Sequence, residues 1–206
     1  MTVVARGREA EILDLGGGRV LRRYLAGGNP EREALVMEHA RRHGYPAPAV
    51  YEAREDALVL ERLDGATMLS DLRRRPWRLR AHAETLALLH KRLHRIEPPA
   101  GLGEGSALIH LDLHPLNVLL TPRGPVVIDW TNARAGDPAL DVALTWVIGS
   151  TSGGLLGRLF VGPFLAHFDR AEVRRALPAA AAYRIADRNV RARERKAVER
   201  LVRAKG

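Results

Sequence analysis

The sequence predicts an α+β fold, in which a small antiparallel sheet with one helix precedes a mostly helical second part. Short β-type runs separated by Gly-rich turns fill residues 1–63, whereas apolar residues recur at helical spacing in residues 64–206. A third observation is the run 110–130, where two His, two Asp and an Asn stand among Leu, Val and Ile. We therefore expect two lobes, 1–63 and 64–206, with a functional segment in the second.

The N-terminal part predicts five strands and one helix. The strand-like runs are 2–5, 11–15, 19–24, 47–53 and 57–63. Gly16 to Gly18 predict a hairpin turn between the second and third strands. The helix begins near Pro30, which suits a first turn, and ends near Gly44. Its expected core face carries Leu35, Val36, His39 and Ala40.

The C-terminal part begins with a helix over residues 77–96. Its apolar stripe consists of Leu79, Ala83, Leu86, Leu89, Leu93 and Ile96. Two short strands, 117–121 and 125–129, follow around a Pro-Arg-Gly turn. From about Pro138 onward the pattern indicates three or four helices.

Composition narrows the class of protein. The chain has 206 residues, 46% hydrophobic and 28% charged, and no cysteine, which excludes disulfides and thiolate metal sites. We see no apolar run long enough for a membrane span and no secretory signal, so we expect a cytoplasmic protein. The net charge is +9, and residues 142–206 carry 13 Lys/Arg against 5 Asp/Glu.

The segment His110-Leu-Asp-Leu-His-Pro-Leu-Asn117 is the strongest chemical signal. It matches the His, Asp, Leu and Asn of the kinase catalytic loop H-R-D-L-x-x-x-N, which is followed by a magnesium-binding Asp. Asp129 ends the next strand, 12 residues after Asn117. Phosphoryl transfer needs a positioned hydroxyl and hard oxygen ligands for Mg²⁺, and these residue types supply both.

The chain resembles the aminoglycoside phosphotransferase family, whose loop is similar to HGDLHPGN, followed by IDW and by GDPxxDLA. The counterparts are HLDLHPLN, IDW at 128–130 and GDPALDVA at 136–143. The resemblance implies a bilobal protein-kinase-like fold and a small-molecule kinase that uses ATP, with GTP left open, and Mg²⁺. It also implies that Asp112 accepts or orients the proton of the acceptor hydroxyl, that His114 hydrogen-bonds phosphate or substrate, and that Asn117 and Asp129 hold the metal.

The same resemblance assigns nucleotide contacts in the first lobe. Gly7 lies in the loop that covers the phosphates, and Glu61 to Leu63 form the hinge beside adenine. Glu33, with Glu38 as the alternative, is the helix glutamate that pairs with a phosphate-binding lysine. That lysine is absent, since the first 90 residues contain none, and Arg22 stands in its place. Arg keeps the charge but has a larger, planar donor group.

The acceptor is the least determined part. Aminoglycosides are polycations, so the basic tail favours a neutral or anionic small hydroxylated molecule. The short segment before His110 leaves the cleft open, which keeps a protein acceptor in view. A basic helix near residues 184–206 with no aromatic residue beyond Tyr183 argues against nucleic acid. The oligomeric state is left open by the sequence.

Three alternatives remain. The missing lysine is compatible with a nucleotide-binding, pseudokinase-like module whose basic tail is an interaction surface. His110, Asp112 and His114 alternate, so on a strand they could form a zinc site of a hydrolase. Asp137 and Asp141 either begin a helix, where Asp is favourable, or brace the catalytic loop.

Overall fold

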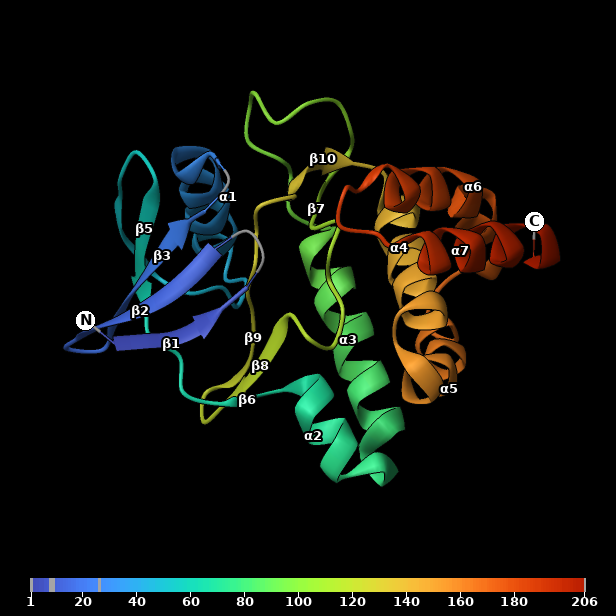
Figure 1. Cartoon of the computed structure of the whole chain (residues 1–206). Coiled ribbons are helices and arrows are strands. Elements are labelled where there is room, and N and C mark those ends of the chain that lie inside the picture. The colour runs from blue at the N-terminus through green and yellow to red at the C-terminus, as the bar shows by residue number, and fades with distance from the viewer. Residues whose placement is uncertain (1, 8–9, 26, 206) are drawn as a thin grey trace.

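The N-terminal part is a five-stranded antiparallel sheet with one helix (Figure 1). The computed structural model describes residues 2–7, 10–25 and 27–205. In the order in which they pair, the strands are β1 (Thr2–Arg6), β2 (Ala10–Gly16), β3 (Arg19–Tyr24), β5 (Ala57–Glu61) and β4 (Val50–Ala53). Helix α1 (Pro30–Arg42) packs against β4 and β5. All five predicted strands and the predicted helix are present, although β4 and β5 are shorter than predicted.

Local chemistry explains where α1 begins and which face it buries. The Asn29 side chain accepts the backbone N–H of Arg32 at 2.9 Å, and Pro30 occupies the first turn. The prediction that Leu35 faces the core is wrong, because 43% of it is exposed. The buried face instead runs through Glu33, Ala34, Val36, Met37 and Ala40. The error arises because Glu33 is a charged residue, so the sequence pattern does not place it on the buried face. In the structure Glu33 is buried because a partner for its charge lies in the sheet.

The second part is mostly helical, and four helices follow Pro138, where the sequence predicted three or four. Its helices are α2 (Met68–Arg74), the 3₁₀ turn η1 (Pro76–Arg78), α3 (Leu79–Leu93), α4 (Pro138–Thr151), α5 (Gly154–Leu165), α6 (Arg170–Ala186) and α7 (Ala192–Lys205). The predicted stripe of α3 is buried from Ala83 to Ile96, while Trp77 before it is 77% exposed. None of the described helices combines the length and the apolar character that a membrane span requires.

Short strands hold the functional segment between the helices. Strand β7 (Ala107–Ile109) pairs with β10 (Arg134–Gly136), and a three-stranded sheet joins β6 (Ala66–Thr67), β8 (Val118–Thr121) and β9 (Gly124–Val127). The β8–β9 hairpin corresponds to the predicted strand pair. Helix α2 and strands β6, β7 and β10 have no counterpart in the sequence prediction.

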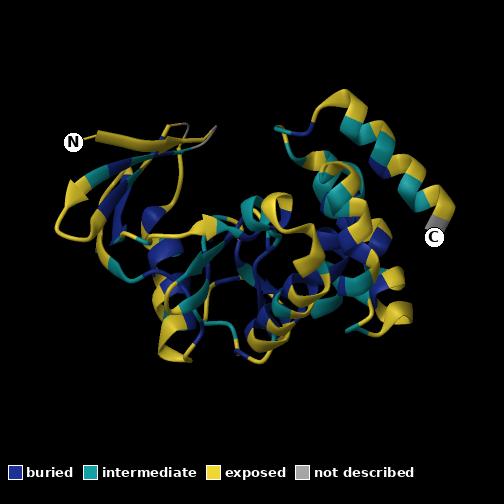
Figure 2. Ribbon diagram, turned by 90° about the horizontal axis from the view of Figure 1, so that it is seen from below, coloured by how far each residue is buried: buried dark blue, intermediate teal, exposed yellow. Residues whose placement is uncertain are grey.

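One cluster of buried side chains includes residues from Val20 in β3 to Val198 in α7. Figure 2 shows buried segments in both parts of the chain. The predicted lobe boundary at residue 63 falls in the link between β5 and β6. The division into 1–63 and 64–206 stays a prediction, because the cluster continues across this link.

Candidate active site

The loop His110–Asn117 connects β7 to β8, and Asp129 lies two residues beyond β9. The β8–β9 hairpin therefore brings Asp129 back beside the loop. Asp112 and Asp129 both line a cavity of about 390 Å³. Leu111 and Asp129 adopt left-handed backbone conformations, with φ of 61° and 66°. Such conformations cost roughly 1–3 kcal/mol each for residues other than glycine and concentrate at functional sites.

Asp112 is held by contacts on both carboxylate oxygens. The Asn117 amide donates to its Oδ2 at 2.8 Å and to its backbone carbonyl at 2.9 Å, while His114 Nε2 lies 3.3 Å from Oδ1. Burial raises the pKa of Asp112, but the hydrogen bond and charge of His114 outweigh it, so the pKa is lowered overall. Asp112 is thus a charged, oriented acceptor of hydrogen bonds at neutral pH.

Arg22 joins the sheet to Asp129. Its guanidinium donates to Asp129 Oδ1 at 2.7 Å and lies 3.5 Å from Glu33 Oε1. Burial lowers the pKa of Arg22, but the charges of Asp129 and Glu33 more than compensate and raise it above its ordinary value. The structure thus brings Glu33 to Arg22, while Glu38, the alternative partner, is exposed.

Thr131 completes this group, although the sequence analysis does not include it. Its hydroxyl lies 2.9 Å from the Arg22 guanidinium, 3.0 Å from Glu33 Oε2 and 3.2 Å from Asp129 Oδ1. Arg32 of α1 also donates to the carbonyls of Thr131 and Ala133, at 3.4 and 2.8 Å. Thr131 directly follows the Ile-Asp-Trp motif, and this position is the one feature of the sequence that could have indicated its role. No feature of the sequence indicates the role of Arg32.

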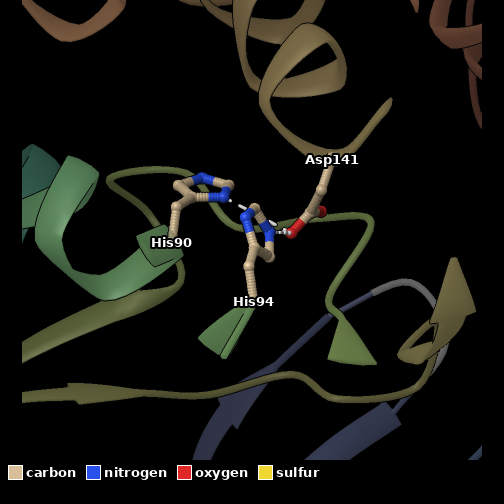
Figure 3. A group of neighbouring side chains, drawn as sticks. All are labelled: His90, His94 and Asp141. Atoms are coloured by element: carbon tan, nitrogen blue, oxygen red, sulfur yellow. Dashed lines mark hydrogen bonds and ion pairs between the residues drawn. The ribbon is translucent and has the colours of Figure 1, made fainter. Parts of the chain in front are cut away.

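Asp141 holds the loop His110–Asn117 through its backbone. Its Oδ1 accepts the Leu111 N–H at 2.7 Å, and its Oδ2 accepts the His110 N–H at 3.2 Å. His90 and His94 at the end of α3 both point to Asp141, with ring nitrogens 3.3 and 2.9 Å from Oδ2 (Figure 3). Burial raises the pKa of Asp141, but the hydrogen bonds and charges of the two histidines lower it well below its ordinary value.

The two aspartates of the GDPALD segment therefore differ. Asp137 accepts the Ala139 N–H at 2.8 Å and is the N-cap of α4, so it begins the helix. Asp141 lies in the first turn of the same helix but is buried and bonded to the loop. The sequence left helix initiation and loop bracing open for both residues. In the structure Asp137 begins the helix and Asp141 braces the catalytic loop.

The two histidines and Asp141 are also a possible metal site. Within the described part of the chain, His90, His94 and Asp141 are the one group of three donor side chains close enough to hold an ion. The Asp141 carboxylate already serves two backbone N–H groups, so loop bracing explains the group without an ion. The zinc alternative fails, because His110 is buried against Trp130, with ring centroids 5.0 Å apart, and does not converge with Asp112 and His114.

The remaining predicted nucleotide residues lie around the sheet. Gly7 is exposed between β1 and β2 and donates its N–H to the Ala10 carbonyl at 2.8 Å; Arg8 and Glu9 lie outside the described residues. The Glu61 carboxylate is engaged by Arg123 and accepts the Ala49 N–H at 3.3 Å. Among the described residues, the backbone of Leu63 has no backbone partner, which leaves its polar groups available.

The far wall of the cavity comes from residues that the sequence analysis does not name. Tyr183 and Arg184 of α6 line it, together with Asn132, which follows Thr131. Arg184 is bound by Asp187 at 3.3 Å and by Glu194 at 2.8 Å. Helical periodicity alone does not reveal which basic residue of the tail turns toward the loop.

This sheet-and-helix arrangement, with an Asp and Asn on one loop and a second Asp after a hairpin strand, is that of a kinase-like phosphotransferase. A model of the RIO domain matches residues 13–137, more than half of the chain, and a model of the phosphotransferase enzyme family matches residues 97–186. The chain therefore belongs to the kinase-like phosphotransferases that these two overlapping models describe. The predicted aminoglycoside phosphotransferase resemblance and protein-kinase-like fold are confirmed; the RIO match was not predicted.

Solved structures share the fold. One is a thermostable mutant of aminoglycoside phosphotransferase APH(4)-Ia in a ternary complex with ADP and hygromycin B, with a TM-score of 0.75, 16% identity, and coverage of 98% of this chain and 93% of that one. Another is an ethanolamine kinase of Plasmodium vivax, with a TM-score of 0.68, 14% identity, and coverage of 98% and 83%.

A curated relative is a probable bifunctional tRNA threonylcarbamoyladenosine biosynthesis protein of Methanoculleus marisnigri. It is 26% identical over 140 residues, which are 62% of this chain and 23% of the relative. The chain thus spans about a quarter of the length of that protein.

Proposed function

We propose that this protein transfers the γ-phosphoryl group of ATP to a hydroxyl group of a small molecule. The observation that carries the proposal is that Asp112 and Asp129 face one cavity, with Asn117 bonded to the first and Arg22 to the second. Two acidic groups with these partners match the needs of phosphoryl transfer, which depends on positioning and charge neutralisation. The ADP complex of the related phosphotransferase supports a nucleotide donor, and GTP is the alternative donor.

At the nucleotide end of the site, the Arg22 guanidinium binds the phosphate groups of the nucleotide. In this proposal the exposed Gly7 turn covers the phosphates, and the unpaired backbone of Leu63 binds the polar edge of adenine. In this scheme the carboxylate of Glu61 has a structural role, since Arg123 engages it, and Glu33 keeps Arg22 oriented.

The donor set fits magnesium. The Asn117 amide nitrogen is used by Asp112, which leaves the amide oxygen for a cation, and the Asp129 side chain is 42% exposed beside the cavity. Both are hard oxygen donors, as Mg²⁺ prefers. When bound, the ion would neutralise charge on the phosphate oxygens.

At the acceptor end, Asp112 accepts a hydrogen bond from the attacking hydroxyl and takes its proton as the new oxygen–phosphorus bond forms and the bond from the γ-phosphorus to the bridging oxygen of ATP breaks, which releases ADP. Its lowered pKa makes it a weak base, so its main contribution is orientation of the hydroxyl. His114 holds the carboxylate in place by its contact with Oδ1.

Charge favours a neutral or anionic acceptor. Residues 142–206, which include α6 and its cavity wall, carry the excess of 13 basic over 5 acidic side chains. A polycationic aminoglycoside would therefore approach a basic surface around the cavity, although the cavity lining itself contains Asp112, Asp129 and Asp187 beside Arg184 and Arg188. ATP as donor and the absence of cysteine in the sequence agree with a cytoplasmic enzyme.

A second candidate is a nucleotide-binding module or a kinase that acts on protein. The RIO domain match and the tRNA-modification relative favour it, as does the replacement of the expected lysine by Arg22. The presence of Asp112, Asn117 and Asp129, with Asn117 bonded to Asp112 and with both aspartates lining one cavity, favours the enzyme, because a module that only binds nucleotide does not need an oriented acceptor group.

Transfer of labelled γ-phosphate from Mg-ATP to a panel of sugars, amino alcohols and amino acids tests the proposal. We expect a labelled product with the wild-type protein, and a turnover about 10²- to 10⁴-fold lower for Asp112→Asn with unchanged Mg-ATP affinity. Full activity of Asp112→Asn contradicts the role of this residue. Nucleotide binding without transfer to any small acceptor favours the second candidate.

A further inference from the structure

A second cavity, of about 240 Å³, opens beside the catalytic loop and is mostly apolar. Its walls come from α2, the loop, α4 and α5; among the lining side chains, Leu72 and Phe164 are buried and Leu116 is 49% exposed. Apolar surface that stays open to water costs free energy, and concave apolar sites of this kind are the usual form of ligand pockets.

The apolar cavity adjoins the polar cavity that contains Asp112. His114 lines the apolar cavity, and its Nε2 lies 3.3 Å from Asp112 Oδ1. Arg184 lines both cavities. His114 and Arg184 therefore lie between the hydroxyl position at Asp112 and the apolar cavity, and an acceptor that uses both cavities would pass beside these two side chains.

The boundary between the two cavities carries little net charge. Arg184 is held between Asp187 and Glu194, so its charge is compensated within the protein. Apart from Arg184 and His114, the described residues that line the apolar cavity are uncharged. The cavity therefore selects an apolar group and provides no counter-charge for an anionic or cationic one.

We propose that the acceptor is an uncharged amphipathic alcohol, whose hydroxyl lies at Asp112 and whose alkyl chain or single ring fills the apolar cavity. The cavity is smaller than the roughly 300–1,000 Å³ of sites that enclose a whole drug-sized ligand, so it takes only part of the acceptor. This inference rests on the proposed function for the reaction, and on the two adjoining cavities for the acceptor.

Binding of alkyl ethers of glycerol tests the inference without nucleotide. The glycerol head is neutral and hydroxylated, and the n-butyl, n-hexyl and n-octyl ethers differ only in apolar length. Below their micelle concentrations, we expect calorimetric affinity for the wild-type protein to rise up to about fourfold per methylene until the cavity is full. The same ethers, assayed with Mg-ATP, are expected to be phosphorylated with kcat/KM rising in the same order.

Leu156 and Leu155 provide a matched pair of variants. Leu156 lines the cavity, whereas its neighbour Leu155 does not and is 73% exposed. Leu156→Trp fills the cavity and should abolish the dependence on chain length, while Leu155→Trp should retain it. Leu69→Trp fills the cavity from α2 and gives the same expected result if Leu156→Trp does not fold. Substitution of Gly157 is avoided, because a Cβ there would lie 2.5 Å from the Gly149 carbonyl.

Two results would overturn the inference. One is wild-type affinity that does not depend on alkyl length; the other is a dependence that persists in folded Leu156→Trp and Leu69→Trp proteins. The proposed function is judged separately, by whether the wild-type protein transfers phosphate to any acceptor of the panel. Asp112→Asn separates the two questions, because it should retain the chain-length dependence of binding while losing transfer.

Discussion

Asp141→Asn is the substitution that best examines how the catalytic loop is held. The new amide can keep one oxygen toward the Leu111 N–H, now 2.7 Å from Oδ1. Its NH₂ group then faces the His110 N–H at the 3.2 Å of the present Oδ2 contact, so two donors oppose each other. His94 also loses its charged partner at 2.9 Å.

The magnitude follows from these contacts. Hydrogen bonds to a charged group contribute about 1.5–3 kcal/mol each, and removing one partner of a buried charged group costs about 3–5 kcal/mol. We therefore expect Asp141→Asn to lower the free energy of unfolding by about 3–5 kcal/mol in urea denaturation. Turnover should fall about 10²-fold, because the loop that carries Asp112 is displaced.

Asp137→Asn is the matched control on the same helix. Asn caps a helix as well as Asp, and only a favourable charge near the N-terminus is lost, so the expected cost is below about 1 kcal/mol. If Asp141→Asn is no more destabilising than Asp137→Asn, bracing of the loop by Asp141 is refuted and both residues merely begin α4.

Three further substitutions or conditions test other contacts. Arg22→Lys should keep the Mg-ATP affinity within about tenfold of the wild-type value, whereas Arg22→Gln should lower it about 10- to 100-fold, because it loses a charged hydrogen bond. Equal calorimetric affinities of the two variants would contradict a role for the charge. Folding lowers the pKa of His90 from an ordinary 6.5 and that of Asp141 from 3.8. The unfolded chain therefore binds more protons than the folded protein, and the free energy of unfolding should fall as the pH drops below about 6.5 and again below about 4. A free energy of unfolding in urea that stays constant across this range would contradict the lowered pKa values. Leu111→Gly relieves about 1–2 kcal/mol of left-handed backbone strain, but it removes a side chain that is only 2% exposed and contributes about 2–5 kcal/mol. We therefore expect the variant to be less stable than the wild-type protein in thermal denaturation. A more stable variant would show that the strain outweighs the burial.

Much of the N-terminal fold is readable because its signals are local. The Gly16–Gly18 turn, the Asn29 and Pro30 start of α1, and the β-type runs each specify their own element. In contrast, β7 and β10 are three residues long and exist because they pair with each other across the chain. Helix α2 has seven residues, too few for a clear apolar stripe.

The candidate site divides in the same way. Asp112, Asn117 and Asp129 are recognisable because they form a motif with fixed spacing, and Arg22 because the expected lysine is missing. Contacts between distant segments leave no such trace. Thr131 reaches Glu33, and Arg184 reaches the cavity from the basic tail, only after the chain has folded.

The burial of Glu33 shows the same limit. Helical periodicity alone gives this charged residue a solvated position, whereas the family resemblance assigns it as the partner of the phosphate-binding residue. In the structure it is 2% exposed and has Arg22, Tyr24 and Thr131 as partners. Burial raises the pKa of Tyr24, and the charge of Glu33 raises it further, so this hydroxyl remains a donor to Glu33.

Calorimetric titration with Mg-ATP, with metal-free and GTP controls, shows whether this site binds a magnesium nucleotide. We expect saturable binding that requires magnesium in the wild-type protein, and loss of that requirement together with weaker binding in Asp129→Ala. Absence of binding at millimolar nucleotide, or binding that is the same with and without magnesium, would contradict a phosphotransferase site built from Asn117, Asp129 and Arg22.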